Sequence, residues 1–448
     1  MASPPPIEPR TLKGFRDYAP ALMIPRERVL QTARTVYRSF GFAPMDTPAL
    51  EYAEVLLGKG GEESDKLVYR FRDHGDRDVA LRFDLTVPFA RFAAQYVPQL
   101  GTPFKRYAMG PVWRGENTAA GRYREFVQCD FDTIGTTSNA ADAEVVLVVN
   151  ALFEALELDD FTIRVNNRLV LNGLLESLGV LDKSVPLLRA LDKLLKMGRD
   201  KVIEEMQREA GVTAEQAAQV LTLAEAEGSN ADKLARVEGL CGGNAKAADG
   251  VARLRELLAV AAAAGVPEGR VRLDLSIARG LDYYTGTIYE TFLTALPGIG
   301  SVCSGGRYDN LAGLYTKQVL PGVGASLGVD RLLTAMEELK HPWLAGVTTT
   351  APLLVLQFPG ASLIDCVSLA TELRKANVGC ELYPDAAKLG KQFQYAEKRG
   401  HTLAVFAGPE ELAAGVVKVK NLAARTEVSV PRGELAAAVV AELARVPS

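Results

Sequence analysis

The stretch that decides the fold is Arg106–Gly135, RYAMGPVWRGENTAAGRYREFVQCDFDTIG. Tyr107–Arg114 and Arg124–Gly135 both alternate between side-chain types in the manner of β-strands. The residues between them, Gly115–Gly121, form a loop without a hydrophobic anchor. The pattern predicts a long β-hairpin with a polar, mobile tip.

The second strand of this hairpin carries an unusual mixture of side chains on one face. A solvated sheet face would explain the charges but not the aromatic ring among them, and a core would not tolerate the charges. Polar groups that converge on a concave sheet are typical of a ligand site. Counting by twos, the face holds Arg124, Phe126, Gln128, Asp130 and Asp132.

A second chemically rich stretch is Leu275–Glu290, LSIARGLDYYTGTIYE. Arg279 precedes a glycine, so a fixed cation can stay exposed at a sharp turn. Tyr283 and Tyr284 add ring faces and hydroxyls, which suit a ligand with anionic oxygens and an aromatic or amine group. An exposed loop with a surface arginine and two half-buried tyrosines explains this stretch equally well on its own.

An earlier pair of strands, Leu67–Phe71 and Val79–Phe83, reads as a hairpin that leads into Asp84, Leu85 and Thr86. If the strand continues, Asp84 and Thr86 lie on one side and can hold an ammonium group. The alternative is that Asp84 caps the following helix, predicted over Val87–Tyr96.

Glycines mark two later segments. In Ser301–Asn310, Gly305 and Gly306 would allow a ligand to approach the backbone closely. In Pro321–Leu333 the order strand, glycine turn, helix puts Arg331 in the first turns of a helix. That arrangement suits either a phosphate site at the helix N-terminus or a glycine packing joint.

The rest of the chain divides into segments by residue composition and expected secondary structure. Residues 1–10 read as a disordered leader, and Pro25–Phe40 as a helix with Pro25 in its first turn. The extended Phe42–Leu50 follows as an edge strand, and the two together are either ordinary elements or part of a dimer interface. The predicted domains are 11–168 with 265–338, a helical insertion at 169–264, a linker at 339–350 and an α/β domain at 351–448.

The α/β domain is predicted from three apolar strands, Leu353–Phe358, Cys380–Tyr383 and Thr402–Ala407, that alternate with helical segments. Such alternation favours a largely parallel sheet.

Composition limits the functional classes. The 448 residues contain 48% hydrophobic and 24% charged residues, which is ordinary for a globular protein of several domains, and no apolar run reaches the ~20 residues of a membrane span. Five cysteines without a CxxC pair favour a reducing, cytoplasmic compartment and argue against a structural zinc site. Three scattered histidines support neither a histidine-based metal site nor a Ser-His-Asp triad.

Together these motifs resemble the histidyl-tRNA synthetases, which are class II aminoacyl-tRNA synthetases. ARGLDYYTGT and SGGRYDNL are similar to the histidine-specific signatures, and LRFDLTVPFAR to the early histidine-site segment. VWRGENTAAGRYREFVQCDFDTIG is similar to class motif 2, GVGASLGVDRL to motif 3, and the helix–strand unit ending near Pro48 to the dimer-building motif 1. The loop tip Asn117–Ala120 departs from the arginine and glutamine with which many bacterial members read the tRNA acceptor end.

The resemblance implies an α+β catalytic domain built on an antiparallel sheet with a helical insertion, followed by a small anticodon-binding domain. It implies ATP-dependent activation of L-histidine and transfer to tRNA(His), with Mg²⁺, by a homodimer that binds no membrane. The catalytic residues it implies are Arg279, Arg114 and Gln128. The implied ATP site is Arg114, Glu116, Arg122, Phe126 and Arg331. The implied histidine site is Asp84, Leu85, Thr86, Arg114, Gln128, Asp132, Arg279, Tyr283, Tyr284 and Tyr308.

Two other readings fit parts of the pattern. The regulatory subunit of ATP phosphoribosyltransferase shares the core but typically lacks the C-terminal domain and the arginine-rich signature, both of which this chain keeps. A class II synthetase for another amino acid would not carry ARGLDYYTG together with DLTVP.

Overall fold

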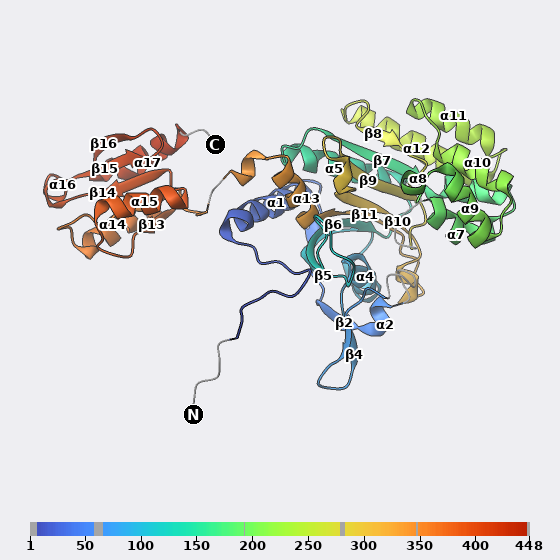
Figure 1. Ribbon diagram of the computed structural model, residues 1–448, viewed down its shortest axis with the longest axis horizontal. Helices are drawn as coiled ribbons and strands as arrows, with labels where there is room; N and C mark the ends of the chain where they lie inside the picture. Colours follow the sequence, from blue (N-terminus) through green and yellow to red (C-terminus); the bar gives the residue numbers. More distant parts are fainter. Residues whose placement is uncertain (1–6, 58–65, 192, 278–282, 346–347, 446–448) are drawn as a thin grey trace. The chain divides into compact units, whose positions relative to one another are not determined.

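The computed structural model describes residues 7–57, 66–191, 193–277, 283–345 and 348–445 (Figure 1). They form two compact units, one made of residues 1–16 and 29–339 and the other of residues 17–28 and 340–448. No helix in the described ranges combines the length and the apolar character needed to cross a membrane.

An eight-stranded sheet is the centre of the first unit, in the order β1-β5-β6-β11-β10-β9-β7-β8. Neighbours from β5 to β7 pair antiparallel, and only the outer pairs β1–β5 and β7–β8 are parallel. The antiparallel sheet expected of the catalytic fold is therefore confirmed. The strands are β1 Ala43–Pro44, β5 Phe104–Trp113, β6 Glu125–Ile134, β7 Phe161–Asn167, β8 Val271–Leu273, β9 Thr287–Leu293, β10 Cys303–Tyr308 and β11 Gly322–Gly328.

The predicted long hairpin is β5 and β6, paired from Phe104↔Ile134 to Trp113↔Glu125. Arg124 lies just before β6. Its Nε donates to the Glu116 carbonyl at 3.2 Å and its Nη1 to that of Lys13 at 3.4 Å. The hairpin tip is thereby bonded to the N-terminal segment.

The two faces of the large sheet have different neighbours because side chains alternate along each strand. Phe131 of β6 lies under Tyr37 of α1 (Pro20–Ser39), with ring centroids 5.0 Å apart, and Tyr289 donates to the Asp142 carbonyl of α5 (Asn139–Ala155) at 2.9 Å. Asp130 and Asp132 point to the opposite face, where α4 (Thr86–Leu100) packs. Helix α13 (Val329–Glu338) follows β11 directly.

Helix α1 begins earlier than expected. It starts at Pro20, a residue suited to the first turn, so Pro25 lies inside the helix rather than in its first turn.

A smaller sheet in the order β2-β4-β3 contains the second predicted hairpin, here β3 (Arg70–Arg72) and β4 (Asp78–Leu81), with β2 (Leu50–Tyr52) beside it and the short α2 (Ala53–Leu56) next in sequence. Strand β4 ends before Asp84, so the strand does not continue through that residue. Asp84 Oδ1 instead accepts from the backbone N–H of Val87 at 3.0 Å, which is the capping arrangement.

Consecutive helices run between β7 and β8 and lie together beside the β7–β8 edge (Figure 1). The close packing of α6 against α12 requires glycine, because a Cβ on Gly173 would be 2.7 Å from that of Ala247. The helices are α6 Arg168–Ser177, α7 Ser184–Leu191, α8 Leu194–Met197, α9 Arg199–Ala210, α10 Ala214–Ala224, α11 Asn230–Leu240 and α12 Ala245–Ala263.

The second unit holds a five-stranded sheet in the order β13-β12-β14-β15-β16. Only the pairs β12–β13 and β12–β14 are parallel, so the expected largely parallel sheet is instead mixed. The sequence prediction missed the antiparallel hairpin of β15 and β16. The strands are β12 Leu353–Val355, β13 Cys380–Leu382, β14 Leu403–Phe406, β15 Val416–Asn421 and β16 Thr426–Pro431.

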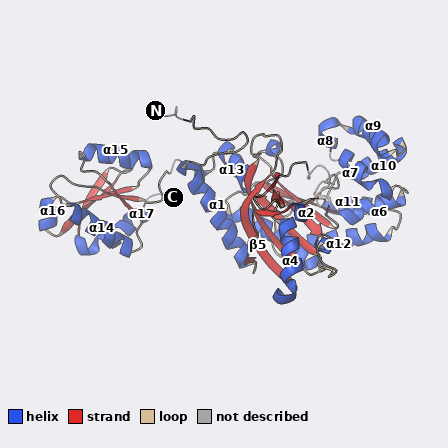
Figure 2. Cartoon of the chain, turned by 90° about the horizontal axis from the view of Figure 1, so that it is seen from below, coloured by secondary structure: helices blue, strands red, loops and turns tan. Residues whose placement is uncertain are grey.

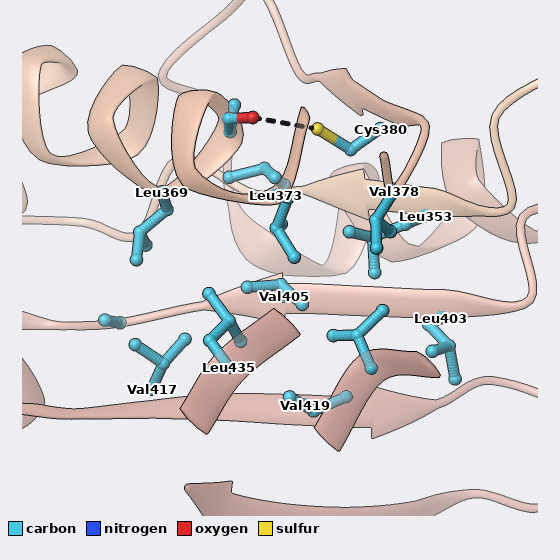
Figure 3. Close-up of a cluster of buried hydrophobic side chains, with 14 of the residues drawn as sticks. Leu353, Leu369, Leu373, Val378, Cys380, Leu403, Val405, Val417, Val419 and Leu435 are labelled. Carbon is cyan, nitrogen blue, oxygen red and sulfur yellow. Dashed lines mark hydrogen bonds between the residues drawn. The ribbon is translucent and has the colours of Figure 1, made fainter. Parts of the chain in front are cut away.

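Helices cover both faces of this mixed sheet (Figure 2). On one face, Leu369 and Leu373 of α14 and Leu435 of α17 pack with the strand valines (Figure 3). Cys380 Sγ donates to the Ala370 carbonyl at 3.4 Å in the same cluster. Ala396 of α15 packs on the other face. The helices are α14 Leu363–Lys375, α15 Leu389–Arg399, α16 Pro409–Ala413 and α17 Leu435–Ala444.

Candidate active site

A hollow lined by charged and polar side chains opens on the sheet face opposite α1. All five residues of the implied ATP site line it, together with Gln128. We call it the arginine-lined hollow. Its lining is Arg114, Glu116, Gly121, Arg122, Tyr123, Phe126, Gln128, Ser301, Val302, Ser304, Ser326, Gly328 and Arg331.

Arg114 lies where the first hairpin strand meets the tip. Its Nε donates to the Phe83 carbonyl at 2.9 Å, and its guanidinium carbon is 5.1 Å from the ring centroid of Phe126. Two opposite contacts thus fix the side chain while other guanidinium N–H groups remain for a ligand. A planar fork held in this way suits bidentate binding of phosphate or carboxylate.

Arg331, the third residue of α13, shares the hollow with two further arginines. Burial, followed by the neighbouring charges of Arg122 and Arg114, lowers the pKa of Arg331 below its usual value. Its Nη1 donates to the Ser301 carbonyl at 2.6 Å, and Glu116 lies 3.5 Å from Arg122. Mutual repulsion among these cations makes the hollow favourable for a polyanion.

Beside the hollow, three aspartates lie buried on the same sheet face. Tyr308 donates to Asp132 Oδ1 at 2.5 Å, and Tyr283 donates to Asp84 Oδ2 at 3.3 Å. Thr86 donates to Asp130 Oδ2 at 3.5 Å. Carboxyl oxygens that are already approached by hydroxyls can accept further donors from a small ligand.

Burial changes the protonation of these groups. It raises the pKa of Asp84 and of Asp132, although nearby arginines oppose the shift in both cases. The pKa of Asp130 rises to about 7, chiefly through burial and against the opposing charge of Arg106. Carboxyl groups whose ionisation is disfavoured by burial favour a ligand that brings positive charge or N–H donors.

The tyrosines form an aromatic wall over these carboxyls. Tyr283 lies edge-on to Tyr284 and to Tyr308, with ring centroids 5.1 and 6.0 Å away. A Cβ on Gly306 would be 2.8 Å from the ring of Tyr284, and one on Gly305 would be 2.1 Å from the Gly324 carbonyl. The two glycines therefore admit a tyrosine ring and a neighbouring strand, which corrects the expectation that they admit a ligand.

Two residues of the implied site stand apart from the rest. Leu85 is buried with Ala108 and Val112 and packs with Phe126, so its side chain supports that ring and does not line the hollow. Arg279 lies outside the described residues.

Sequence reasoning missed one charged side chain altogether and passed over another. Arg106 of β5 is fully buried, and its Nη2 lies 2.6 Å from Asp132 Oδ2 and 3.8 Å from Asp130 Oδ2. The strand register shows the pairing, because Arg106 lies directly opposite Asp132 across the hairpin, and the local sequence pattern carries no register. Asp130 was counted on the face but assigned no role.

Comparison with known proteins finds related sequences over nearly the whole chain. The family model described as histidyl-tRNA synthetase matches residues 14–332, and the anticodon binding domain model matches residues 360–442. The chain is 58% identical to the histidine–tRNA ligase of Rhodopirellula baltica over 94% of both chains. It is 46% identical to that of Wolinella succinogenes, over 93% of this chain and 94% of the relative.

Solved structures are similar too. The histidyl-tRNA synthetase from Nostoc sp. PCC 7120 superposes with a TM-score of 0.87 at 34% identity, covering 97% of this chain and 100% of the other. A Bacillus halodurans protein described as an ATP phosphoribosyltransferase regulatory subunit/histidyl-tRNA synthetase has a TM-score of 0.71 at 22% identity, covering 87% and 97%, and shows the fold alone. The chain belongs to the histidyl-tRNA synthetase family of class II aminoacyl-tRNA synthetases.

Proposed function

We propose that this chain activates L-histidine with ATP to histidyl-adenylate, releases pyrophosphate, and transfers histidine to the 3′ end of tRNA(His). The observation that carries the proposal is the contiguity of two regions of opposite charge. Arg114 lines the arginine-lined hollow, and its charge acts on Asp84, where it partly opposes the rise in pKa that burial causes. Phosphate and amino acid would therefore meet at Arg114.

In the activation step, the histidine carboxylate attacks the α-phosphate of ATP. Two anions must approach each other, so stabilisation of developing charge dominates the barrier. Arg114 would bind the α-phosphate and the substrate carboxylate, while Arg122 and Arg331 would hold the outer phosphates. Arg279 would stabilise the pentacoordinate phosphate. No general base is needed, because the carboxylate is already ionised at neutral pH.

Adenine would lie on Phe126, with Glu116 at its edge. Histidine would lie between the aspartates and the tyrosine wall, with Gln128 at the junction of the two regions. Selection against other amino acids would come from buried acceptors and hydroxyls that stay unpaired when the wrong side chain enters. Such unpaired groups cost on the order of 1–3 kcal/mol each.

Mg²⁺ would enter with ATP. It binds through substrate phosphates, waters and one or two carboxylates. Glu116 lines the hollow, and Glu290 lies on the same sheet face because it pairs with Ser304 across β9 and β10. The described residues contain no cluster of three potential His, Cys, Asp or Glu ligands. Glu116 and Glu290 therefore suit a cation that arrives bound to the nucleotide. The cation would help to neutralise the phosphate charge.

We also propose roles for the domains, a homodimer and a cellular compartment. We assign residues 11–168 and 265–338 to catalysis, 169–264 to a helical insertion, 339–350 to a linker and 351–448 to anticodon binding. The motif 1-like unit of α1 and β1 supports a homodimer. Five free, buried cysteines are typical of a reducing compartment such as the cytoplasm.

Pyrophosphate exchange tests the proposal directly. Purified protein should exchange labelled pyrophosphate into ATP with histidine and with none of the other nineteen amino acids, and it should charge tRNA(His). Exchange with a different amino acid, or with none, would overturn the assignment. Arg279→Ala should abolish exchange while leaving the thermal unfolding transition unchanged, and exchange near the wild-type rate would remove Arg279 from the mechanism.

A further inference from the structure

Beneath the proposed histidine pocket, one buried guanidinium faces three buried carboxyl groups. Arg106 is fully buried, and Asp84, Asp130 and Asp132 are each no more than 3% exposed. We call these four residues the acidic floor. If all were ionised, the floor would carry two net negative charges away from water. Such a cluster persists only when every member has a defined role or partner.

Arg106 approaches the carboxyls mainly as a charge. Its Nη2 donates to the Leu85 carbonyl at 3.1 Å and lies 2.6 Å from Asp132 Oδ2. Its Nε and Nη1 have no hydrogen-bond acceptor among the described residues, and the guanidinium carbon lies 4.3 Å from the ring centroid of Phe89. The side chain therefore packs on α4 with its guanidinium directed toward the three carboxyl groups. It does not bind any of them through two parallel hydrogen bonds.

Asp130 lies between Arg106 and Thr86. Its Oδ2 accepts from Thr86 and lies 3.8 Å from Arg106. Strand register places Ser326 and Ser304 in the same cross-strand row as Asp130, and hydrogen bonding to Ser326 partly opposes the rise in the pKa of Asp130 that burial causes. Arg106 and Asp130 are thus connected, through Asp132 and Thr86, to both ends of the proposed histidine pocket.

We propose that Arg106 and Asp130 are positioning residues for histidine, which hold Asp132 and Thr86 in place as a charge-matched pair without touching the amino acid. The proposal rests on the proposed function, since it assigns Asp132 and Thr86 to histidine. Arg106 fixes the carboxylate of Asp132 from below while Tyr308 fixes it from the side. Asp130 orients the hydroxyl of Thr86, so its oxygen lone pairs turn toward the substrate ammonium.

Charge matching makes a specific prediction for single and paired substitutions. Removing Arg106 alone leaves three carboxyls without their buried cation, which is far more harmful than removing a pair together. Arg106→Met should raise the KM for histidine on the order of 100-fold and the KM for ATP by less than about 3-fold. Asp130→Asn should raise the histidine KM about 10-fold, because its amide still reaches Thr86 but lacks the charge.

The double variant distinguishes positioning from simple damage. Arg106→Met with Asp130→Asn keeps the net charge of the floor, so its histidine KM should fall well below that of Arg106→Met alone, toward that of Asp130→Asn. Arg106→Lys serves as the conservative variant and should recover part of the loss, because it keeps the charge without the planar group. The readout is steady-state pyrophosphate exchange with the two substrates varied separately.

A matched control is Arg91→Met, which removes another largely buried ion pair, to Glu51, in the same unit. It should lower the melting temperature without changing the histidine KM. The proposal is overturned if Arg106→Met changes the two KM values equally, or if the double variant is as impaired as Arg106→Met or more so. If Arg106→Met does not fold, Arg106→Lys and the double variant carry the same comparison.

Failure of the proposed function would be seen separately. Wild-type protein without histidine-dependent exchange overturns the function before any variant is measured, whereas normal wild-type exchange with a histidine KM insensitive to Arg106 overturns only the positioning role.

Discussion

The arginine-lined hollow and the acidic floor lie side by side on one sheet face and recognise their proposed ligands by opposite means. The side chain of Arg122 in the hollow is 46% exposed, whereas that of Arg106 in the floor is 0% exposed. Exposed cations attract a large polyanion at little desolvation cost, and water screens any imperfect fit. Buried carboxyls discriminate, because each group left unpaired is costly. Under the proposed function, ATP would be attracted by charge and histidine would be selected by the geometry of desolvated groups.

The largest test of this comparison is Arg114→Gln, because Arg114 is proposed to serve both regions. Loss of its fixed fork would remove the proposed contacts to the α-phosphate and to the substrate carboxylate in the transition state. We expect kcat/KM for pyrophosphate exchange to fall on the order of 10³-fold. Arg72→Gln on the exposed strand β3 is the matched control and should leave exchange unchanged. A loss of less than tenfold for Arg114→Gln would mean that the two regions do not meet there.

Asp84→Asn tests the floor without disturbing α4. The asparagine carbonyl can still accept from the N–H of Val87, so the helix start should be kept. The other carboxyl oxygen, which accepts from Tyr283, becomes an NH₂ group that cannot accept. The histidine KM should rise on the order of 100-fold with the ATP KM nearly constant. Equal rises in both KM values would contradict the division between the regions, and Asp46→Asn at an exposed carboxylate is the control.

Phe126→Leu tests the hollow with a smaller effect. Loss of base stacking costs roughly 1–3 kcal/mol in other proteins, so the ATP KM should rise about tenfold. The histidine KM should stay within a factor of about two, because the aspartates are untouched. Phe71→Leu on exposed β3 removes a ring of the same size away from the site. A larger effect on histidine than on ATP would reverse the proposed assignment of the two regions.

Periodicity explains why much of this site could be predicted from the sequence. The period of two in Arg124–Gly135 put Phe126, Gln128 and Asp132 on one face, and the structure brings them there. The same local pattern gave no register, so it could not show that Arg106 pairs with Asp132. A lone arginine in a strand reads as surface, and only the partner strand turns it into a buried ion pair.

The sequence prediction also missed strand β15 of the second unit. Val416–Asn421 alternates valine with lysine as a half-buried strand does, yet the strand prediction for this domain relied on apolar runs, and β15 was missed. In the structure Lys418 lies 3.3 Å from Glu411 and 3.4 Å from Glu427, so its charge is balanced locally. For Asp84 the sequence left two interpretations open, because a strand end and a helix cap share the same residue types and only tertiary context separates them.

The smallest expected effect concerns stability, and it follows from how the floor titrates. In the folded state the pKa of Asp130 is raised from 3.8 to about 7, first by burial, so the folded protein holds this proton more tightly than the unfolded chain. Stability from this group is complete below pH 3.8 and is lost as the pH rises through about 7. Asparagine does not ionise, so Asp130→Asn removes this loss of stability with rising pH. The groups whose charges or hydrogen bonds act together with Asp130 are Arg106, Asp132, Asp84, Thr86, Ser326 and Tyr284 on its own side of the sheet, and Cys303 and Tyr37 across the sheet.

Melting curves at pH 5 and pH 8 therefore sharpen the contrast between buried and exposed carboxyls. The melting temperature of Asp130→Asn minus that of wild type should increase from pH 5 to pH 8, by roughly 2–4 °C for each ~1 kcal/mol. Asp73→Asn is the opposite control, since hydrogen bonding to Arg77 lowers the pKa of that exposed carboxyl and its contribution is already complete at pH 5. A difference for Asp130→Asn that stays flat or falls with pH would mean that the floor keeps Asp130 ionised, with Arg106 fully neutralising it.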